Sequence, residues 1–194
     1  MLRAWAAQSS PVWFLGVHMY DLARFLLGGA QGVAVWGTGA RGRCRELGVD
    51  TWDSVSAKVL FDNGATVAFD TAWILPDGFE AVVNQGIRLV GTHGMLECDS
   101  QDRGTLTCCD SDTPPQQTHN QNFLRRQVDK RGREVWEGYG MTSIADFALN
   151  VNLLLEGQTL ADLGEYPSGQ DGLEATRIAA GVHRSLETGG LVEL

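Results

Sequence analysis

The stretch DSVSAKVLFDNGATVAFDTAW, residues 53–73, decides the fold class of this chain. From 55 to 61 every second residue is apolar, which is the period of a β-strand with one buried face. Asn63-Gly64 is a preferred sequence for a tight hairpin turn, and residues 65–73 return with further β-forming residues. The stretch therefore predicts a pair of antiparallel strands.

Short runs on both sides of this hairpin predict further strands, and turn signals such as Pro76-Asp77-Gly78 separate them. The predicted strands cover residues 33–36, 79–90, 95–98, 104–109 and 191–194. Because consecutive strands with short connections pair antiparallel, we expect a mainly antiparallel sheet. Residues 110–138 lose this periodicity, so they predict a long loop or arm with one strand near 134–136, its basic residues lying on a solvated surface.

Helical spacing of apolar residues appears near both ends of the chain. It predicts one helix over 13–27, which Gly28-Gly29 ends, and two more over 143–156 and 169–188. Thr142 or Ser143 can cap the second helix, and Ser168 can cap the third. The order of elements indicates an α+β fold, a mainly antiparallel open-faced sheet with helices packed on one face. We expect residues 1–194 to form a single domain.

The composition excludes several classes of function. The chain has 15 Lys and Arg against 24 Asp and Glu, a net charge of −9, which argues against binding to nucleic acid or to a membrane surface. No apolar stretch approaches the roughly 18 residues of a membrane span. Residues 8–11, Gln-Ser-Ser-Pro, interrupt any signal-peptide core. We therefore expect a cytoplasmic protein.

The four cysteines do not predict a metal site. Cys44 and Cys98 are isolated and Cys108 and Cys109 are adjacent, so no pair has the two-residue spacing of a zinc knuckle. We expect free, mostly buried thiols, and a disulfide between Cys98 and Cys108 across a hairpin stays an open alternative. No metal is predicted.

Residues 37–42, Gly-Thr-Gly-Ala-Arg-Gly, match the G-x-G-x-x-G pattern of dinucleotide-binding loops. Such a loop must open a helix within a parallel βαβ unit, because the helix N-terminus holds the pyrophosphate. Here only residues 43–47 precede Gly48, and a β pattern follows from Asp53. We therefore expect a glycine-rich connection between strands and no cofactor-binding residue in this chain.

The first predicted helix carries His18 and Asp21 three positions apart, on one face. A carboxylate beside a histidine can fix its tautomer, and such a histidine can transfer protons. The simpler alternative is a histidine that hydrogen-bonds a carbonyl or Asp21 at a helix end. Two ligands are also too few for a zinc site.

Several short motifs then occur in the order and spacing of a known family. They are Gly16-Val17-His18 with Asp21-Leu22, residues 61–65 (Phe-Asp-Asn-Gly-Ala), residues 91–96 (Gly-Thr-His-Gly-Met-Leu), Phe147 before Gly157, and residues 189–192 (Gly-Gly-Leu-Val). With these motifs nearly the whole chain resembles the C-terminal domain of the Gfo/Idh/MocA oxidoreductases, relatives of glucose–fructose oxidoreductase and inositol dehydrogenase. The resemblance implies the α+β fold of glyceraldehyde-3-phosphate-dehydrogenase-like C-terminal domains, with the N-terminal Rossmann domain of the family absent.

The resemblance implies a substrate-side domain. NAD or NADP would be bound by the missing Rossmann domain, so the isolated chain is expected to be inactive. His18 would contact or deprotonate the reacting hydroxyl of a sugar or polyol. Trp13, Asp21 and Trp73 would contact the substrate, since aromatic faces suit the C–H surfaces of carbohydrates, although Trp73 could equally belong to the core. The exposed sheet face would form a homodimer.

Two features depart from the family pattern. Many members have an aspartate four residues before the histidine, where this chain has Phe14. The catalytic lysine of the family belongs to the Rossmann half, and neither Lys58 nor Lys130 stands in such a context. Phe14 favours an alternative function, a non-catalytic sugar-binding or oligomerisation module derived from the family.

Overall fold

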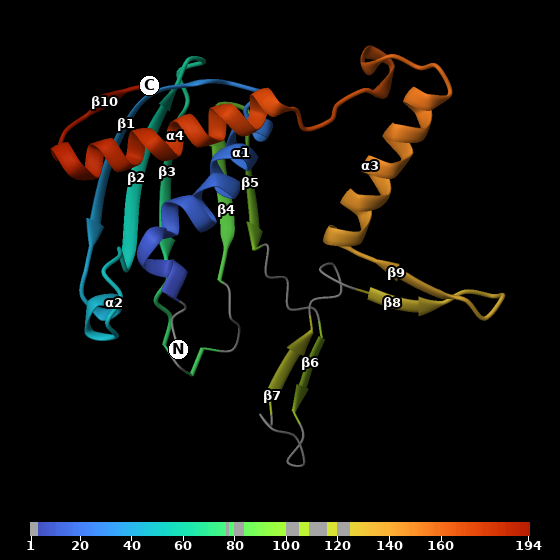
Figure 1. Ribbon diagram of the computed structural model, residues 1–194, viewed down its shortest axis with the longest axis horizontal. Helices are drawn as coiled ribbons and strands as arrows, with labels where there is room; N and C mark the ends of the chain where they lie inside the picture. Colours follow the sequence, from blue (N-terminus) through green and yellow to red (C-terminus); the bar gives the residue numbers. More distant parts are fainter. Residues whose placement is uncertain (1–3, 77, 80–83, 100–104, 109–115, 120–124) are drawn as a thin grey trace. The chain divides into compact units, whose positions relative to one another are not determined.

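The computed structural model describes all residues except 1–3, 77, 80–83, 100–104, 109–115 and 120–124 (Figure 1). The chain divides into two compact units, which are described separately. Unit 1 comprises Met1–Pro76 and Pro167–Leu194, and unit 2 comprises Asp77–Tyr166. The expectation of a single domain over residues 1–194 stays a prediction. Within the described ranges, no helix combines the length and the apolar character that a membrane crossing requires.

Unit 1 contains a four-stranded antiparallel sheet in the order β10-β1-β2-β3. Its strands are β1 (Gly32–Ala40), β2 (Ser54–Phe61), β3 (Thr66–Ala72) and β10 (Val192–Glu193). The hairpin between β2 and β3 turns at Asn63-Gly64, where Gly64 has a φ of 83° and the Asn63 side chain accepts the N–H of Ala65 at 3.0 Å. The predicted antiparallel hairpin is therefore confirmed.

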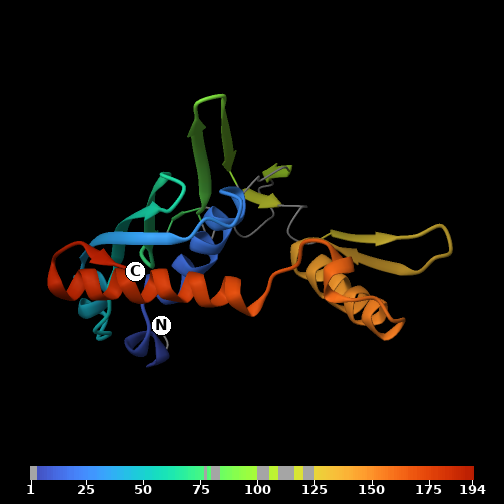
Figure 2. The same cartoon turned by 90° about the horizontal axis from the view of Figure 1, so that it is seen from above.

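Helices cover one face of this sheet (Figures 1 and 2). They are η2 (Val12–Gly16), which is a π-helical turn, α1 (Val17–Leu26) and the long α4 (Gly169–Thr188). The short η1 (Ala4–Gln8) precedes them in the chain. A further short helix, α2 (Arg43–Glu46), lies between β1 and β2. The alternation predicted for 55–61 holds, because Val55, Ala57, Val59 and Phe61 are buried and the residues between them are not.

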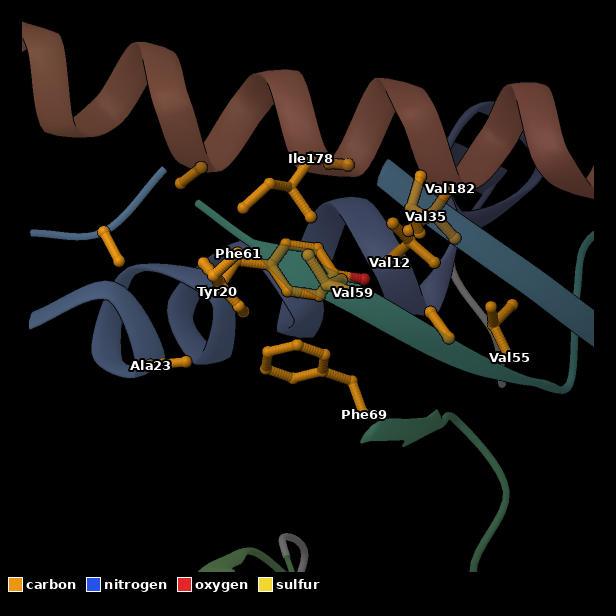
Figure 3. Packing of buried hydrophobic residues seen from close by; sticks show 14 residues of the cluster. Val12, Tyr20, Ala23, Val35, Val55, Val59, Phe61, Phe69, Ile178 and Val182 are labelled. Carbon is orange, nitrogen blue, oxygen red and sulfur yellow. The ribbon is translucent and has the colours of Figure 1, made fainter. Parts of the chain in front are cut away.

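The core of unit 1 lies between this face and the helices (Figure 3). Tyr20 of α1 packs edge-on against Phe69 of β3, with ring centroids 4.8 Å apart. Ile178 and Val182 of α4 are fully buried in the same cluster. The α+β prediction, an open antiparallel sheet with helices on one face, is confirmed.

Among its described residues, unit 2 contains three two-stranded antiparallel hairpins. Their strands are β4 (Gly86–Gly91) with β5 (Gly94–Asp99), β6 (Thr105–Cys108) with β7 (Gln116–His119), and β8 (Arg125–Val128) with β9 (Glu134–Glu137). Two helical segments follow, α3 (Tyr139–Leu155) and η3 (Leu160–Leu163).

The strand predicted near 134–136 is confirmed as β9, but the prediction that the rest of 110–138 is irregular is wrong, because this range also contributes β7 and β8. Arg125 and Arg126 of β8 pair across the hairpin with Glu137 and Glu134 of β9, and these side chains are exposed or half-exposed. Arg125 directly faces Glu137, whereas Arg126 reaches Glu134 diagonally across the hairpin. Opposite charges at facing or diagonal positions stabilise such a hairpin, and an apolar period does not reveal them. Part of the predicted arm, including Pro114 and Pro115, lies outside the described residues.

The described cysteines differ in their surroundings. Cys44 is buried, Cys98 is exposed, and both are free thiols. Burial and the neighbouring Asp53 carboxylate raise the pKa of the Cys44 thiol to about 11, so this cysteine is an inert core residue. The expectation of mostly buried thiols is thus wrong for Cys98. Cys109 lies outside the described residues.

Candidate functional site

The helical segment that carries His18 begins at Ser10 and Pro11. The Ser10 hydroxyl accepts the N–H of Trp13 at 3.3 Å, and its carbonyl accepts the N–H of Phe14 at 3.1 Å. A serine cap followed by proline is a common way to start a helix, because proline lacks the N–H that would stay unpaired there. The helical structure therefore starts about two residues earlier than the apolar periodicity predicts.

The first turn of this segment, η2, has π-helical geometry and runs directly into α1. The N–H of Val17 donates to the carbonyl of Val12, five residues back. π-Helices are rare, occur mostly as single turns within α-helices and are frequent at functional sites. This turn lies immediately before His18.

One side of the segment is exposed. Phe14, His18 and Asp21 all lie on it, and the Phe14 side chain is 52% exposed. Within the part of the chain that the structure describes, no hydrogen bond or ion pair joins the side chains of His18 or Asp21 to another residue. The alternative of a histidine bonded to a carbonyl or to Asp21 is therefore not what the structure shows.

Three aromatic rings from distant parts of unit 1 form a group that we call the aromatic shelf: Trp5, Phe14 and Trp73. Trp5 of η1 stacks on Phe14 with centroids 5.2 Å apart, and Trp73, which follows β3, meets both rings edge-on at 5.8 and 6.0 Å. Trp5 is 43% exposed and Trp73 is half-buried. Phe14 belongs to the turn before His18, so the shelf lies beside an exposed imidazole.

Trp13 belongs to a different group. Its ring stacks on the ring of His183 in α4, with centroids 5.3 Å apart and an interplanar angle of 10°. The His183 Nε2 is 2.9 Å from the Ser10 hydroxyl, which is buried. Burial lowers the pKa of His183, the Glu187 carboxylate opposes that shift, and the Arg41 guanidinium reinforces it. Trp13 and Trp73, both predicted to contact the substrate, thus pack against different ring partners.

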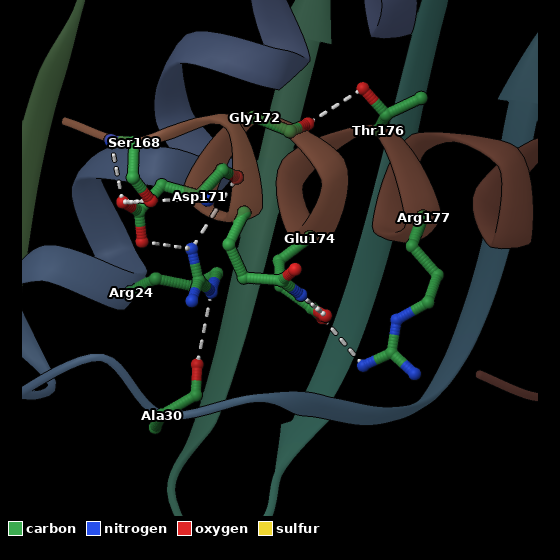
Figure 4. Close-up of polar contacts among 9 residues, drawn as sticks. Arg24, Ala30, Ser168, Asp171, Gly172, Glu174, Thr176 and Arg177 are labelled. Carbon is green, nitrogen blue, oxygen red and sulfur yellow. Dashed lines mark hydrogen bonds and ion pairs between the residues drawn. The ribbon is translucent and has the colours of Figure 1, made fainter.

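The other side of the segment is packed. Arg24 of α1 is buried and donates to the carbonyl of Ala30 at 3.2 Å and to the Asp171 carboxylate of α4 at 3.3 Å (Figure 4). Asp171 also accepts from Ser168 in the capping box of α4. The hydrogen bonds from Ser168 and the Arg24 guanidinium hold the pKa of Asp171 below its usual value, with burial opposing them. These contacts fasten α1 to the start of α4.

Residues 3–97, about half of the chain, match the family described as GFO/IDH/MocA C-terminal domain. This chain carries a Gfo/Idh/MocA C-terminal domain. The matched range contains His18, Asp21 and the whole aromatic shelf. No curated protein sequence gives a significant match.

Solved structures share the fold of this Gfo/Idh/MocA domain. A myo-inositol dehydrogenase from Corynebacterium glutamicum is 19% identical, with a TM-score of 0.63, over 100% of this chain and 52% of its own. A scyllo-inositol dehydrogenase from Lactobacillus casei, solved with NAD(H) and scyllo-inositol, is 15% identical, with a TM-score of 0.60, over 95% of this chain and 48% of its own. An aldose–aldose oxidoreductase from Caulobacter crescentus, solved with glycerol, is 18% identical, with a TM-score of 0.63, over 99% of this chain and 51% of its own. The chain therefore spans about half the length of the solved proteins that it matches.

The glycine motif of this Gfo/Idh/MocA domain does not fit a dinucleotide. Gly37 and Gly39 lie inside strand β1 rather than in a loop, which corrects the predicted connection between strands. The N–H of Gly37 donates to the Ser185 hydroxyl of α4 at 2.8 Å, and a Cβ on Gly39 would lie 2.8 Å from the Trp52 ring. These glycines allow close packing of a helix and an indole on the strand, so they leave no room for a pyrophosphate.

The short helix after this motif already holds an anionic group at its N-terminus. The buried Asp53 carboxylate accepts the N–H groups of Arg43 and Cys44 at 2.8 and 2.7 Å. Burial would raise the pKa of Asp53, but these backbone donors outweigh burial and lower it. The donors that a phosphate would need are thus occupied. Among the described side chains, no group of three His, Cys, Asp or Glu could hold a metal ion.

Proposed function

We propose that this chain is the substrate-side half of an NAD(P)-dependent oxidoreductase that acts on a sugar, a polyol or a similar hydroxy compound. The observation that carries the proposal is the exposed His18 beside the aromatic shelf, in a domain of the Gfo/Idh/MocA family. The solved relatives with this fold include inositol dehydrogenases and an aldose–aldose oxidoreductase.

His18 is the proposed catalytic residue. Oxidation of an alcohol to a carbonyl releases the hydroxyl proton, and histidine is the side chain that most often accepts such a proton. His18 is exposed and has no side-chain partner among the described residues, so its ring is free to meet a substrate hydroxyl. Asp21, one turn further along the same side, is proposed to accept a hydrogen bond from a second hydroxyl.

The aromatic shelf is the proposed contact for the apolar face of the substrate. Ring C–H bonds of a sugar or cyclitol carry a small positive charge, which the negative face of an aromatic ring attracts. Trp73 contributes through the shelf, together with Trp5 and Phe14, which the sequence analysis did not propose as ligands. Trp13 stays a proposed substrate contact only through the exposed part of its ring, because His183 covers one face.

NAD or NADP is proposed to bind outside this chain. The cofactor supplies the hydride acceptor, and Gly37, Gly39 and the Asp53-capped helix do not fit it. We therefore expect the isolated chain to show no turnover and no saturable quenching of its six tryptophans by NADH or NADPH at high micromolar concentration.

The decisive test joins the chain to the nucleotide-binding half of a solved relative, such as the Corynebacterium glutamicum myo-inositol dehydrogenase. NAD(P)H formation is then measured with a panel of cyclitols, aldoses and linear polyols. We expect turnover with at least one of them, its loss in His18→Ala, and its retention in the control His93→Ala, which removes an exposed histidine of unit 2. Full activity of His18→Ala would remove His18 from the mechanism.

Phe14 favours the second candidate function, a non-catalytic sugar-binding or oligomerisation module. The phenyl ring stands where many relatives have an aspartate, and it stacks on Trp5 instead of offering a carboxylate. If the fused protein binds both NAD(H) and a polyol but forms no NAD(P)H, and Phe14→Asp does not restore turnover, this second function replaces the first.

We also propose that the chain forms a homodimer through the open face of the unit 1 sheet. Trp36 is 49% exposed on this face, with Val33 on the same strand and Leu60 on the neighbouring strand. Large apolar side chains together on an open sheet indicate a surface that a partner covers. Light scattering on wild type and Trp36→Lys tests this, with a shift from dimer to monomer expected for the variant. A monomeric wild type would exclude the dimer.

A further inference from the structure

His183 lies on α4, 173 residues from Ser10 along the chain, and contacts the very start of the His18 helix. Its Nε2 meets the hydroxyl of Ser10, which also accepts the N–H of Trp13. Its ring lies parallel to the ring of Trp13. One imidazole therefore holds both the cap and the first-turn side chain of this helix.

The π-helical turn η2 begins two residues after Ser10, contains Trp13 and ends immediately before α1. A π turn places one additional residue in the turn, and it is seldom stable unless tertiary packing selects it. On its far side Gly16 lies against Tyr20, because a Cβ at Gly16 would be 2.9 Å from the Tyr20 hydroxyl. The turn is thus held between His183 on one side and Tyr20 on the other.

The geometry of this turn sets the direction in which Phe14 and His18 point. A change from π to α geometry would rotate Phe14 relative to His18, because the two turns differ in residues per revolution. It would also move the Phe14 ring away from Trp5, on which it now stacks. The contact that selects the π turn consequently selects the arrangement of the exposed histidine and the shelf.

We propose that His183 is a positioning residue, which acts through Ser10 and Trp13 to hold the π turn and so aligns His18 with the aromatic shelf. The functional part of this inference rests on the proposed role of His18, but the structural part does not. The charged groups that act on His183 are Glu187 on its own helix and Arg41 after β1. The positioning of His18 requires neither charge, because it depends on the contact of His183 with the Ser10 hydroxyl and on its stack with the Trp13 ring.

The test measures hydrogen exchange of the Val17 N–H, the donor of the π-helical hydrogen bond, relative to the Val59 N–H in the centre of β2. His183→Gln keeps a hydrogen-bonding group for Ser10 but loses the ring stack, whereas His183→Phe keeps the stack but loses the hydrogen bond. We expect each variant to speed exchange at Val17 at least tenfold more than at Val59. His183→Ala loses both contacts, so we expect it to increase exchange at Val17, relative to Val59, more than either single-contact variant does.

Ser185→Ala is the matched control. Ser185 also lies on α4, is buried, and bonds to Gly37 and Gly190, so its loss destabilises the fold without touching the His18 helix. We expect it to speed exchange at Val17 and Val59 by the same factor. Equal factors at the two sites in the His183 variants would overturn the positioning role and leave only general stabilisation.

Turnover of the fused enzyme supplies the functional readout. We expect His183→Phe to lower kcat about tenfold and to change KM less than twofold, because His18 is displaced while Trp5 and Trp73 keep their edge-on contact. Loss of activity in His18→Ala without any effect in His183→Phe would overturn the positioning role alone. Selective exchange at Val17 together with a fully active His18→Ala would instead overturn the proposed function and keep the structural coupling.

Discussion

The helical segment over residues 12–26 has one side that packs against the rest of unit 1 and one side that faces solvent. On the packed side, Tyr20 and Arg24 are buried and their partners come from β3 and α4. On the solvent side, Phe14, His18 and Asp21 are exposed, and Phe14 stacks within the aromatic shelf. Neither His18 nor Asp21 makes a side-chain hydrogen bond or ion pair with another described residue. The comparison teaches that the residues that fasten this helix and the proposed catalytic residue lie on opposite sides of it. Substitutions on the two sides should therefore separate effects on stability from effects on activity.

The largest expected effect is on the solvent side and concerns activity. His18→Ala should lower turnover of the fused enzyme about a hundredfold to ten-thousandfold, the usual contribution of a proton-transfer group. The free energy of unfolding of the isolated chain should change by less than about 0.5 kcal/mol, because an exposed side chain without partners is removed. Urea denaturation measures the second quantity, and a large loss of stability would place His18 on the packed side.

The next effect is on the packed side. Asp171→Ala removes the carboxylate that pairs with the buried Arg24, so the unfolding free energy should fall by about 3 kcal/mol. This is the lower end for a broken buried pair, because the Asp171 side chain is 38% exposed. Arg24→Met should cost less, since it leaves no unpaired charge inside. The urea midpoints of the two variants test this order. An equal loss of unfolding free energy in both would show that the charge of Arg24 is well solvated.

A smaller effect is expected where the two sides meet, at Gly16. A methyl group there would press on the Tyr20 ring, which Phe69 holds from another direction. Gly16→Ala should therefore destabilise unit 1 by about 1–3 kcal/mol, even though alanine favours helices. Adding Tyr20→Phe, which removes the closest atom, should recover part of this loss. A stabilised Gly16→Ala variant would show that the π turn does not depend on close packing.

The smallest effect concerns pH. The pKa of His183 is lower in the folded chain than the ordinary value, mainly because of burial. A lowered folded pKa means that the contribution of His183 is complete above about pH 6.5 and is lost as the pH falls below that value. The unfolding free energy of wild type should therefore fall more steeply between pH 7.5 and 5.5 than that of His183→Phe. Parallel pH profiles would show that His183 is fully solvated.

Local signals in the sequence predicted much of unit 1. The Asn63-Gly64 turn, the alternation over 55–61 and the Ser168 cap all appear in the structure, because each depends on residues near one another in the chain. The G-x-G-x-x-G match at residues 37–42 does not form the predicted connection between strands, because Gly37 and Gly39 lie within β1. The hairpin of β8 and β9 escaped prediction because cross-strand ion pairs, not an apolar period, mark it.

The candidate site was only partly predictable. Helical spacing placed His18 and Asp21 on one side, and a helix does ensure that residues three apart share a face. Trp73 was selected as an aromatic residue near a turn, but its partners Trp5 and Phe14 come from segments about 60 residues away. The role of Ser10 as a helix cap could have been predicted, because a serine followed by a proline is typical of a helix start.

The sequence by itself determined the strand pairing around residues 53–73, the helical face that carries His18 and the family to which the domain belongs. These properties depend on turn chemistry, periodicity and short motifs, all of which are local. Only the tertiary structure decided that Trp13 stacks on His183, that Trp73 joins Trp5 and Phe14, and that Arg24 pairs with Asp171. The residues in these contacts lie far apart in the sequence and meet only when the chain folds. No local sequence pattern specifies which of the distant side chains will pack against each other.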